Sequence, residues 1–261
     1  MERAVYADYH VHTRLSPCGK PQATTAAMLA RARQKGLAAI GFSDHVTPRP
    51  VPGCGFYRKQ RPHLLTDLRA EIETLPTPPG LRVLVGVEAD YSLAGPACLD
   101  EALRALADHV VVAASHFHLS GAPQPADDRP RAKAELMLQV AAGALALPGA
   151  DIWAHPFDCS RLRPLGAILA TVADAELAAL IALANQRGVA VEINGGPAQE
   201  EAYRLAMARF YGLAREMGAR FTVTADAHHP DDFERLDLAL RWAREMGVRD
   251  RELVTVEGLV G

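Results

Sequence analysis

The sequence has few cysteines, and none of them lies close to another. Only four occur in 261 residues, namely Cys18, Cys54, Cys98 and Cys159, and no CxxC pair is present. Disulfide-dependent domains carry closely spaced cysteines, and zinc ribbons carry CxxC pairs. The spacing therefore indicates neither kind of protein, and we expect most of these thiols to be reduced packing residues.

Long apolar runs and an excess of positive charge are also lacking. No window reaches the run of about 18 uncharged apolar residues that a membrane span needs, and the N-terminus lacks a signal-peptide core. The formal net charge of −3 gives no positive field that would attract nucleic acid or an anionic membrane. We expect a cytoplasmic protein that binds neither, and the sequence indicates no particular oligomeric state.

A repeated unit runs along the chain: a short apolar run, a polar loop, and a helical stretch that ends at glycine. This order is βα repetition. Runs such as HVVVAAS and GVAVEIN are apolar throughout, which is typical of a parallel sheet covered by helices. The length suits one α/β barrel, so we expect a single domain over residues 1–261. The seven expected strands lie near 5–12, 38–44, 82–89, 109–116, 151–155, 189–194 and 221–226.

Helices are expected over 24–35, 199–217 and 231–246, each closed by a glycine at Gly36, Gly218 or Gly247. A further helix is expected to be capped by Asp174 and to end at Gly188. Its apolar stripe consists of Leu177, Leu180, Ile181 and Ala184. The proline-containing stretches 46–62 and 119–130 each follow a strand end, and we expect them to be long loops over the active face.

Eight of the ten histidines fall at the C-terminal ends of predicted strands or just beyond them. A (β/α) barrel builds its active site from these strand ends. Histidines placed only for packing have no reason to choose that end of each strand. The distribution therefore favours one shared site made from His10, His12, His45, His116, His118, His155, His228 and His229.

Acidic residues stand at the same strand ends. In the motif DYHVH the period of two points His10 and His12 to one side. Glu88 lies on an apolar strand, where an unpaired carboxylate is costly and a metal partner is favoured. Imidazoles with a bridging carboxylate suit zinc, manganese or iron, so we expect two or three divalent ions. Asp8 and Asp44 are expected to hydrogen-bond a ligand histidine or the backbone.

Taken together, the motifs DYHVH, SDH, GVEAD, ASHFH, AHP and DAH resemble the signature of the polymerase-and-histidinol-phosphatase (PHP) family. The match runs in order from Asp8 to His228. The resemblance implies an α/β fold, a distorted (β/α)7 barrel with two or three metal ions. It implies three ligand sets: His10, His12, Glu88 and Asp226; Glu88, His116 and His155; and His45 with His228.

One position departs from the family pattern. Phosphatases of the family often carry a histidine six positions after the second histidine of DxHxH, and this chain has Cys18 there. A thiolate is a good zinc ligand, so we expect Cys18 to complete the third site. The alternative is a small residue in a tight Ser-Pro-Cys-Gly turn, which would leave a binuclear site.

Clustered divalent ions activate water and stabilise the oxygens of an in-line displacement, and a phosphate ester uses this chemistry best. We therefore expect a metal-activated hydroxide to hydrolyse a small phosphomonoester. Asp226 and His228 are placed at the reaction centre, and His118 is expected to protonate the leaving group. The expected substrate-binding residues are Arg161, a bidentate phosphate clamp, with Lys20 and His229.

The single-domain size resembles histidinol-phosphate phosphatases of histidine biosynthesis, so the sequence predicts a histidinol-phosphatase-like phosphoric monoester hydrolase. Three alternatives stay open: a nucleotide phosphatase of the same family, an amidohydrolase-like amide or lactone hydrolase, and a metal-binding module without turnover. The absence of an obvious bridging lysine and the presence of Glu88 argue against the amidohydrolase. The filled ligand positions favour catalysis over the module.

Overall fold

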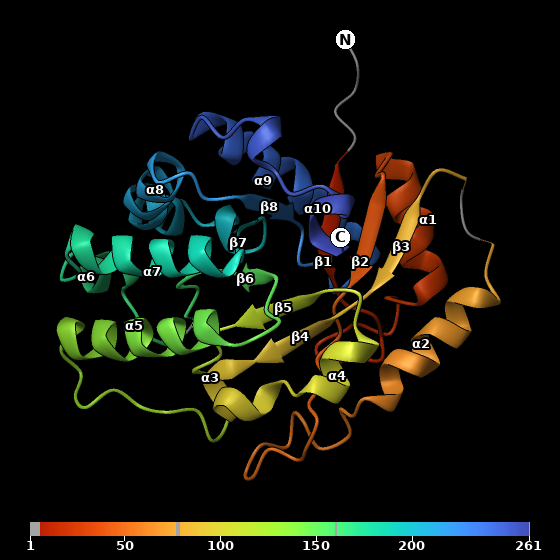
Figure 1. The fold of residues 1–261 in the computed structure, drawn as a ribbon, viewed down its shortest axis with the longest axis horizontal. Coiled ribbons are helices and arrows are strands. Elements are labelled where there is room, and N and C mark those ends of the chain that lie inside the picture. Colours follow the sequence, from red (N-terminus) through yellow and green to blue (C-terminus); the bar gives the residue numbers. More distant parts are fainter. Residues whose placement is uncertain (1–5, 77–78, 160, 261) are drawn as a thin grey trace.

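Eight strands and ten α-helices alternate along the chain in the computed structural model, which describes residues 6–76, 79–159 and 161–260 (Figure 1). Every pairing between these strands is parallel. The first predicted strand begins at residue 5, which lies outside the described residues. The strands are β1 Ala7–Val11, β2 Ala39–Phe42, β3 Arg82–Val85, β4 Val87–Asp90, β5 Val110–Ala113, β6 Ile152–Ala154, β7 Ala190–Asn194 and β8 Phe221–Thr224.

The strands form two parallel sheets, in the orders β1-β2-β3 and β4-β5-β6-β7-β8. Strands β3 and β4 are separated by Gly86 alone, so the predicted strand 82–89 is one run that changes its partner from β2 to β5. Two isolated parallel bridges join the sheets, one between Val11 and Ala227 and one between His45 and Glu88. This closed order is compatible with the distorted seven-stranded barrel that the sequence predicts.

Helices flank the strands on their outer side, with α1 and α2 beside the three-stranded sheet and α5, α7, α8 and α9 beside the five-stranded sheet (Figure 1). Among the described residues, no helix is both long and apolar enough to cross a membrane. The helices are α1 Thr25–Lys35, α2 His63–Glu73, α3 Tyr91–Ala94, α4 Glu101–Leu106, α5 Pro130–Ala146, α6 Leu165–Leu169, α7 Asp174–Arg187, α8 Glu201–Glu216, α9 Glu234–Glu245 and α10 Val256–Val260. Short 3₁₀ turns occur at Gly95–Cys98, Pro197–Gln199, Pro230–Phe233 and Asp250–Glu252.

The local signals at the helix ends act largely as predicted. Gly36 and Gly188 end α1 and α7 in the left-handed conformation, and the predicted stripe of α7 is buried. The prediction that Asp174 caps α7 is wrong, because the cap is Ala173 and Asp174 is the first helical residue. The Glu176 carboxylate accepts a hydrogen bond of 2.9 Å from the amide of the cap residue Ala173. This contact fixes the start of the helix one residue earlier than the sequence predicts.

Apolar side chains fill both faces of the strands. On the outer face they pack against the helices in one large cluster. On the inner face, mainly alanine, valine and isoleucine, with Tyr9 and Leu84, form a second cluster that also contains Val254 and Val256 from the C-terminal segment. The Val254 amide donates a hydrogen bond of 2.8 Å to the carbonyl of Phe221, the first residue of β8. The segment therefore covers the end of the sheets where the strands begin, and the opposite end is left to the polar residues.

A buried histidine fills the space beside the junction of β3 and β4. His109 is fully buried, its Nε2 lies 2.8 Å from the carbonyl of Tyr9, and burial lowers its pKa to about 4. A Cβ added at Gly86 would lie 2.4 Å from both the His109 ring and its carbonyl oxygen. Glycine is therefore required where this run changes sheets.

Replacement of Gly86 by alanine should destabilise the fold, because the new methyl group would collide with His109 and with backbone. Overpacking of this kind costs about 1–3 kcal/mol in free energy of unfolding. Urea unfolding of Gly86→Ala against wild type measures the loss. Gly212→Ala is the control, since a Cβ at Gly212 in α8 meets no atom within 4 Å and should be neutral or stabilising. Equal stability of Gly86→Ala and wild type would contradict this account.

Candidate metal centre

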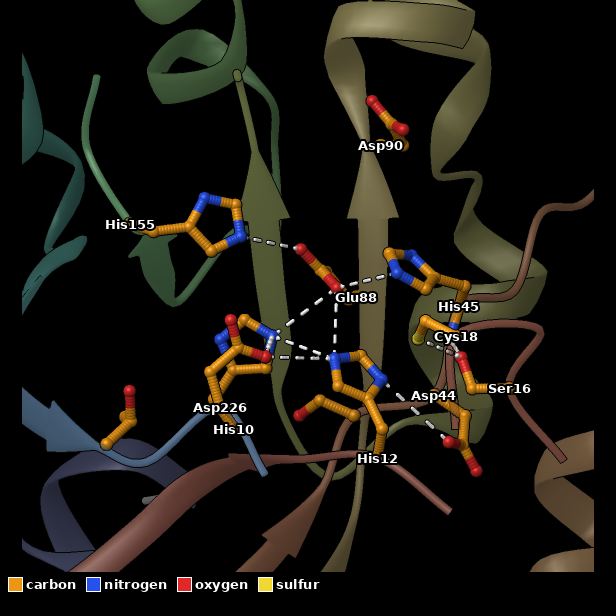
Figure 2. Close-up of polar contacts among 12 residues, drawn as sticks. His10, His12, Ser16, Cys18, Asp44, His45, Glu88, Asp90, His155 and Asp226 are labelled. Carbon is orange, nitrogen blue, oxygen red and sulfur yellow. Dashed lines mark hydrogen bonds and ion pairs between the residues drawn. The ribbon is translucent and has the colours of Figure 1, made fainter. Parts of the chain in front are cut away.

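The carboxylate of Glu88 on β4 lies at the centre of a ring of imidazoles and is only 1% exposed (Figure 2). Its two oxygens face different groups of histidines. Oε2 lies 3.1–3.3 Å from the Nε2 atoms of His10, His12 and His45, and Oε1 lies 3.1 Å and 3.6 Å from the Nε2 atoms of His155 and His116. This arrangement is that of a carboxylate able to bridge two cations.

A second carboxylate approaches the ring from the end of β8. Oδ1 of Asp226 lies 3.4 Å from Nε2 of His12, 3.6 Å from Nε2 of His10 and 3.7 Å from Nδ1 of His228. Asp226 has a φ of 51° and His155 a φ of 24°, conformations that non-glycine residues seldom adopt. Two residues of the ring are thus held by strained backbone just beyond the strand ends.

The outer nitrogen of most of these imidazoles is already engaged. Nδ1 of His10 lies 2.7 Å from Glu192, and Nδ1 of His116 lies 3.0 Å from Asp90. Nδ1 of His45 lies 2.8 Å from the Tyr57 hydroxyl, and Nδ1 of His155 lies 2.8 Å from the Ser115 hydroxyl. Partners of this kind fix the ring orientation and leave the inner nitrogen free for a metal.

Glu192 on β7 is a functional residue that the sequence reasoning missed. It is fully buried and pairs with Nδ1 of His10, and it accepts hydrogen bonds from the His155 amide, the Thr224 hydroxyl and the Asn194 side chain. The run GVAVEIN was interpreted as an apolar strand, and its single carboxylate was passed over. The cost of burying a charge, already applied to Glu88, was the signal that would have found it.

The two aspartates expected to support the site do so through the backbone. Asp8 accepts hydrogen bonds from the amides of His10 and Ala225 at 3.1 Å and 2.9 Å, so it ties β1 to the end of β8. Asp44 accepts from the amide and the hydroxyl of Thr13, both at 2.6 Å. Burial raises the pKa of Asp8 to about 7, although the hydrogen bonds from the His10 and Ala225 amides act in the opposite direction.

The electrostatics of the ring favour ionised acids. Burial alone would raise the pKa of Glu88, but the imidazoles of His45 and His10 outweigh it and hold that pKa well below its usual range. The same balance, led by His10 and His228, lowers the pKa of Asp226. Both acids are therefore ionised, and a bound divalent ion would supply the positive charge that the imidazoles supply in its absence.

The donor atoms fit divalent metal ions. Nε2 of His10 and Nε2 of His12 face each other at 3.2 Å, so the two nitrogens can share a proton or bind a common cation. Nδ1 of His12 and Oδ1 of Asp226 are buried, and neither has a hydrogen-bond partner in the part of the chain that the structure describes. Nitrogen and oxygen donors in this mixture are typical ligands of zinc, manganese and iron.

The structure brings together all nine residues predicted to hold metal. They form five groups of three whose ligand atoms lie within 4.8 Å of one another. These groups overlap: His45 joins Glu88 and His116, and His155 joins His10 and Asp226. The remaining groups are His10, His12 and Glu88; His12, Asp226 and His228; and His12, Cys18 and His45.

A small pocket of about 160 Å³ opens onto this ring. His118, Phe56 and Leu119 complete its lining, so the two predicted loops 46–62 and 119–130 do reach the active face. The centroid of the His118 ring lies 5.6 Å from that of His116. Burial and the charge of His116 lower the pKa of His118. The three predicted catalytic residues, Asp226, His228 and His118, all line the pocket.

The structure does not bring the predicted substrate-binding residues into the pocket. Arg161 is exposed and lies outside the lining, and the Lys20 side chain is exposed although its amide donates to the His228 carbonyl at 2.9 Å. His229 caps the turn Pro230–Phe233, where its Nδ1 accepts a hydrogen bond of 3.1 Å from the Asp231 amide. These side chains follow the local geometry of their loops and turns, which the strand order does not determine.

A parallel α/β fold with imidazoles and carboxylates gathered at its strand ends defines a protein built to hold divalent metal ions. The chain belongs to the PHP domain family, whose model matches residues 8–196. The resemblance drawn from the motifs is thereby confirmed. The match covers the strands and loops that supply every ligand candidate except Asp226 and His228, which follow it.

Several known proteins are similar to this chain at low sequence identity. A probable phosphatase of Vibrio vulnificus strain YJ016 is 26% identical over 255 residues, 95% of this chain and 88% of the relative. The structure of a histidinol phosphate phosphatase from Lactococcus lactis, complexed with zinc, L-histidinol and phosphate, has a TM-score of 0.62 at 15% identity and 94% coverage of both chains. A putative histidinol phosphatase of Listeria monocytogenes has a TM-score of 0.56 at 13% identity, with 88% of this chain and 97% of that chain covered.

Replacement of Glu192 by glutamine should weaken metal binding without emptying the site. The variant keeps the shape of the side chain but removes the charge that orients His10, and losses of such partners typically weaken metal affinity about 10–100-fold. Competition with a chromophoric chelator measures the zinc affinity. Glu216→Gln, an exposed change at the end of α8, is the control and should match wild type. Wild-type affinity in Glu192→Gln would show that Glu192 has no orienting role.

Proposed function

We propose that this protein is a metal-dependent phosphoric monoester hydrolase that acts on a small phosphorylated substrate. The observation that carries the proposal is the placement of Glu88, whose two oxygens face two groups of imidazoles beside a small pocket. A site that places two divalent ions side by side is suited to displacement at phosphorus. Membership of the PHP domain family and the similarity to probable phosphatases support the same conclusion.

The residues that would hold the ions are those of the five ligand groups, and we propose two or three ions of zinc, manganese or iron. When bound, such ions lower the pKa of water and neutralise the charge that develops on the phosphoryl oxygens. The chain itself orients the ligands through Glu192, Asp90, Tyr57 and Ser115. This preorganisation reduces the rearrangement needed when substrate enters.

The chain offers histidines as its own donors to the substrate. Of the residues described, no lysine or arginine side chain lines the pocket, so His118, which belongs to none of the ligand groups, is left to contact the phosphate or the leaving group. His118 lies on the loop side of the ring, beside Leu119 and Phe56. We assign to His118 the exchange of a proton with the leaving-group oxygen.

Histidinol phosphate is the substrate to test first. A histidinol phosphate phosphatase of similar fold was crystallised with zinc, L-histidinol and phosphate. The pocket of about 160 Å³ suits a phosphate with a small leaving group and leaves a larger one outside the enclosed space. An amidohydrolase-type reaction is disfavoured because Glu88 lies where it could bridge two ions and, in the described part of the chain, no lysine lines the pocket.

Phosphate release should depend on metal. We expect purified protein loaded with Mn²⁺, Zn²⁺ or Fe²⁺ to release phosphate from histidinol phosphate or another small phosphomonoester, to lose this activity on chelation, and to regain it on metal addition. The panel also contains nucleoside monophosphates, amides and lactones. Turnover of amides or lactones alone would contradict the proposal. Tight metal binding without turnover of any compound in the panel would favour a non-catalytic module.

His118 should matter to turnover and His229 should not. His118→Ala removes a pocket imidazole and is expected to lower kcat about 10²–10⁴-fold with its metal content unchanged. His229→Ala removes only the cap of a surface turn, so its kcat should equal that of wild type. Steady-state kinetics on the best substrate and elemental analysis of both variants test this pair. A His118→Ala enzyme with wild-type kcat would remove His118 from the reaction.

A further inference from the structure

We propose that Cys18 supplies a thiolate to a metal position shared with His12 and His45, and that this position selects a thiophilic ion such as Zn²⁺ over Mn²⁺ or Mg²⁺. The inference deepens the proposed function, since it concerns the same pocket. The ligand atoms of the three residues lie within 4.8 Å of one another, and all three line the pocket. None of the other four ligand groups contains sulfur.

The turn that carries Cys18 is fixed from several sides. The Gly19 amide donates to the Ser16 carbonyl at 3.1 Å, and the Lys20 amide donates to the His228 carbonyl at 2.9 Å. A Cβ on Gly19 would lie 1.9 Å from the Thr13 carbonyl oxygen, so only glycine allows the turn to close so tightly. The predicted tight turn therefore exists, and it places the thiol against the imidazoles.

The sulfur faces polar atoms. Sγ of Cys18 lies 3.2 Å from the Ser16 hydroxyl, which itself accepts a hydrogen bond of 3.3 Å from the His45 amide. Figure 2 shows Cys18 between Ser16 and the rings of His12 and His45. A cysteine retained only as a small packing residue has no need of such surroundings. The other three cysteines are buried and belong to none of the ligand groups.

An independent observation points to a ligand at this position. His12 is fully buried, yet among the described residues its Nδ1 has no hydrogen-bond partner. The Oδ1 atom of Asp44 lies 3.9 Å from this nitrogen and already accepts a hydrogen bond from Thr13. A buried polar nitrogen without a partner is costly. The ring of His12 stacks between those of His45 and His228, at centroid distances of 5.0 Å and 4.4 Å. A cation beside this stack would complete a site with one thiolate and several imidazoles.

The chemistry of the donors predicts which ion binds there. Thiolate and imidazole together favour zinc, cobalt and cadmium, whereas carboxylate-rich sites accept manganese and magnesium. The ring around Glu88 mixes imidazole with carboxylate, so the two kinds of position should differ in metal preference. The position beside Cys18 would then bind a thiophilic ion, and the positions around Glu88 would accept a wider range of divalent ions.

Cobalt substitution tests the thiolate directly. Metal-stripped wild-type protein, titrated with Co²⁺ without added thiol, should develop a near-ultraviolet thiolate-to-cobalt charge-transfer band. Cys18→Ser should lose the band and one bound ion per chain, and its preference for Zn²⁺ over Mn²⁺ should fall on the order of tenfold or more. Cys18→His should lose the band but keep the ion. Cys98→Ala, which removes a buried thiol outside the ligand groups, is the control and should retain both band and ion count.

The readouts are an absorption band and a metal count, so they do not depend on any phosphatase activity. A wild-type protein fully loaded with cobalt but without the band would overturn the assignment of Cys18. Persistence of the band in Cys18→Ser, or an unchanged metal count in that variant, would do the same. Failure of the phosphatase assay with the cobalt band present would refute the proposed function alone.

Discussion

The burial of the Glu88 carboxylate is the constraint on which the rest of the site depends. An ionised acid removed from water is costly unless neighbouring positive or donor groups compensate it. Five imidazoles converge on it, and most of these imidazoles are themselves held by a further partner. Those partners are in turn anchored in strands and loops. The polar site therefore includes the Glu88 carboxylate, the imidazoles around it and the partners of those imidazoles. Its geometry follows from the need to compensate the buried charge of Glu88.

The backbone places these groups by departing from regular strand geometry where the strands end. The register of β1 against β2 shifts between Asp8 and Val11, and His10 lies within this irregularity. His155 and Asp226 adopt positive φ values. Conformations of this kind cost about 1–3 kcal/mol each and persist only where surrounding contacts compensate them. The regular strands therefore determine where the ligand residues lie, and the irregular backbone at the strand ends determines how their side chains point.

The fold and the gathering of the strand-end histidines and acids could be predicted from the sequence because both depend on periodic signals. Continuous apolar strands followed by glycine-closed helices indicate a parallel α/β arrangement, and parallel strands bring their carboxyl ends together. Glu192 was missed because one carboxylate does not disturb the apolar pattern of β7. Arg161, Lys20 and His229 lie outside the pocket lining because side chains beyond a strand follow turn chemistry, as the capping role of His229 shows. The break at Gly86 was hidden because it depends on His109, which is distant in sequence.

The ligand ring lies at the junction between the two sheets. The sheets meet through two isolated bridges, and one of these joins His45 directly to Glu88. Donors on both sides of this seam, His10 and His12 on one and Glu88 and Asp226 on the other, surround the same space. Ions held there would clamp the two halves of the molecule together, and their binding energy would add to its cohesion. Loss of the ions would loosen this seam, while the two apolar clusters, each of which contains residues of both sheets, would still hold the sheets together.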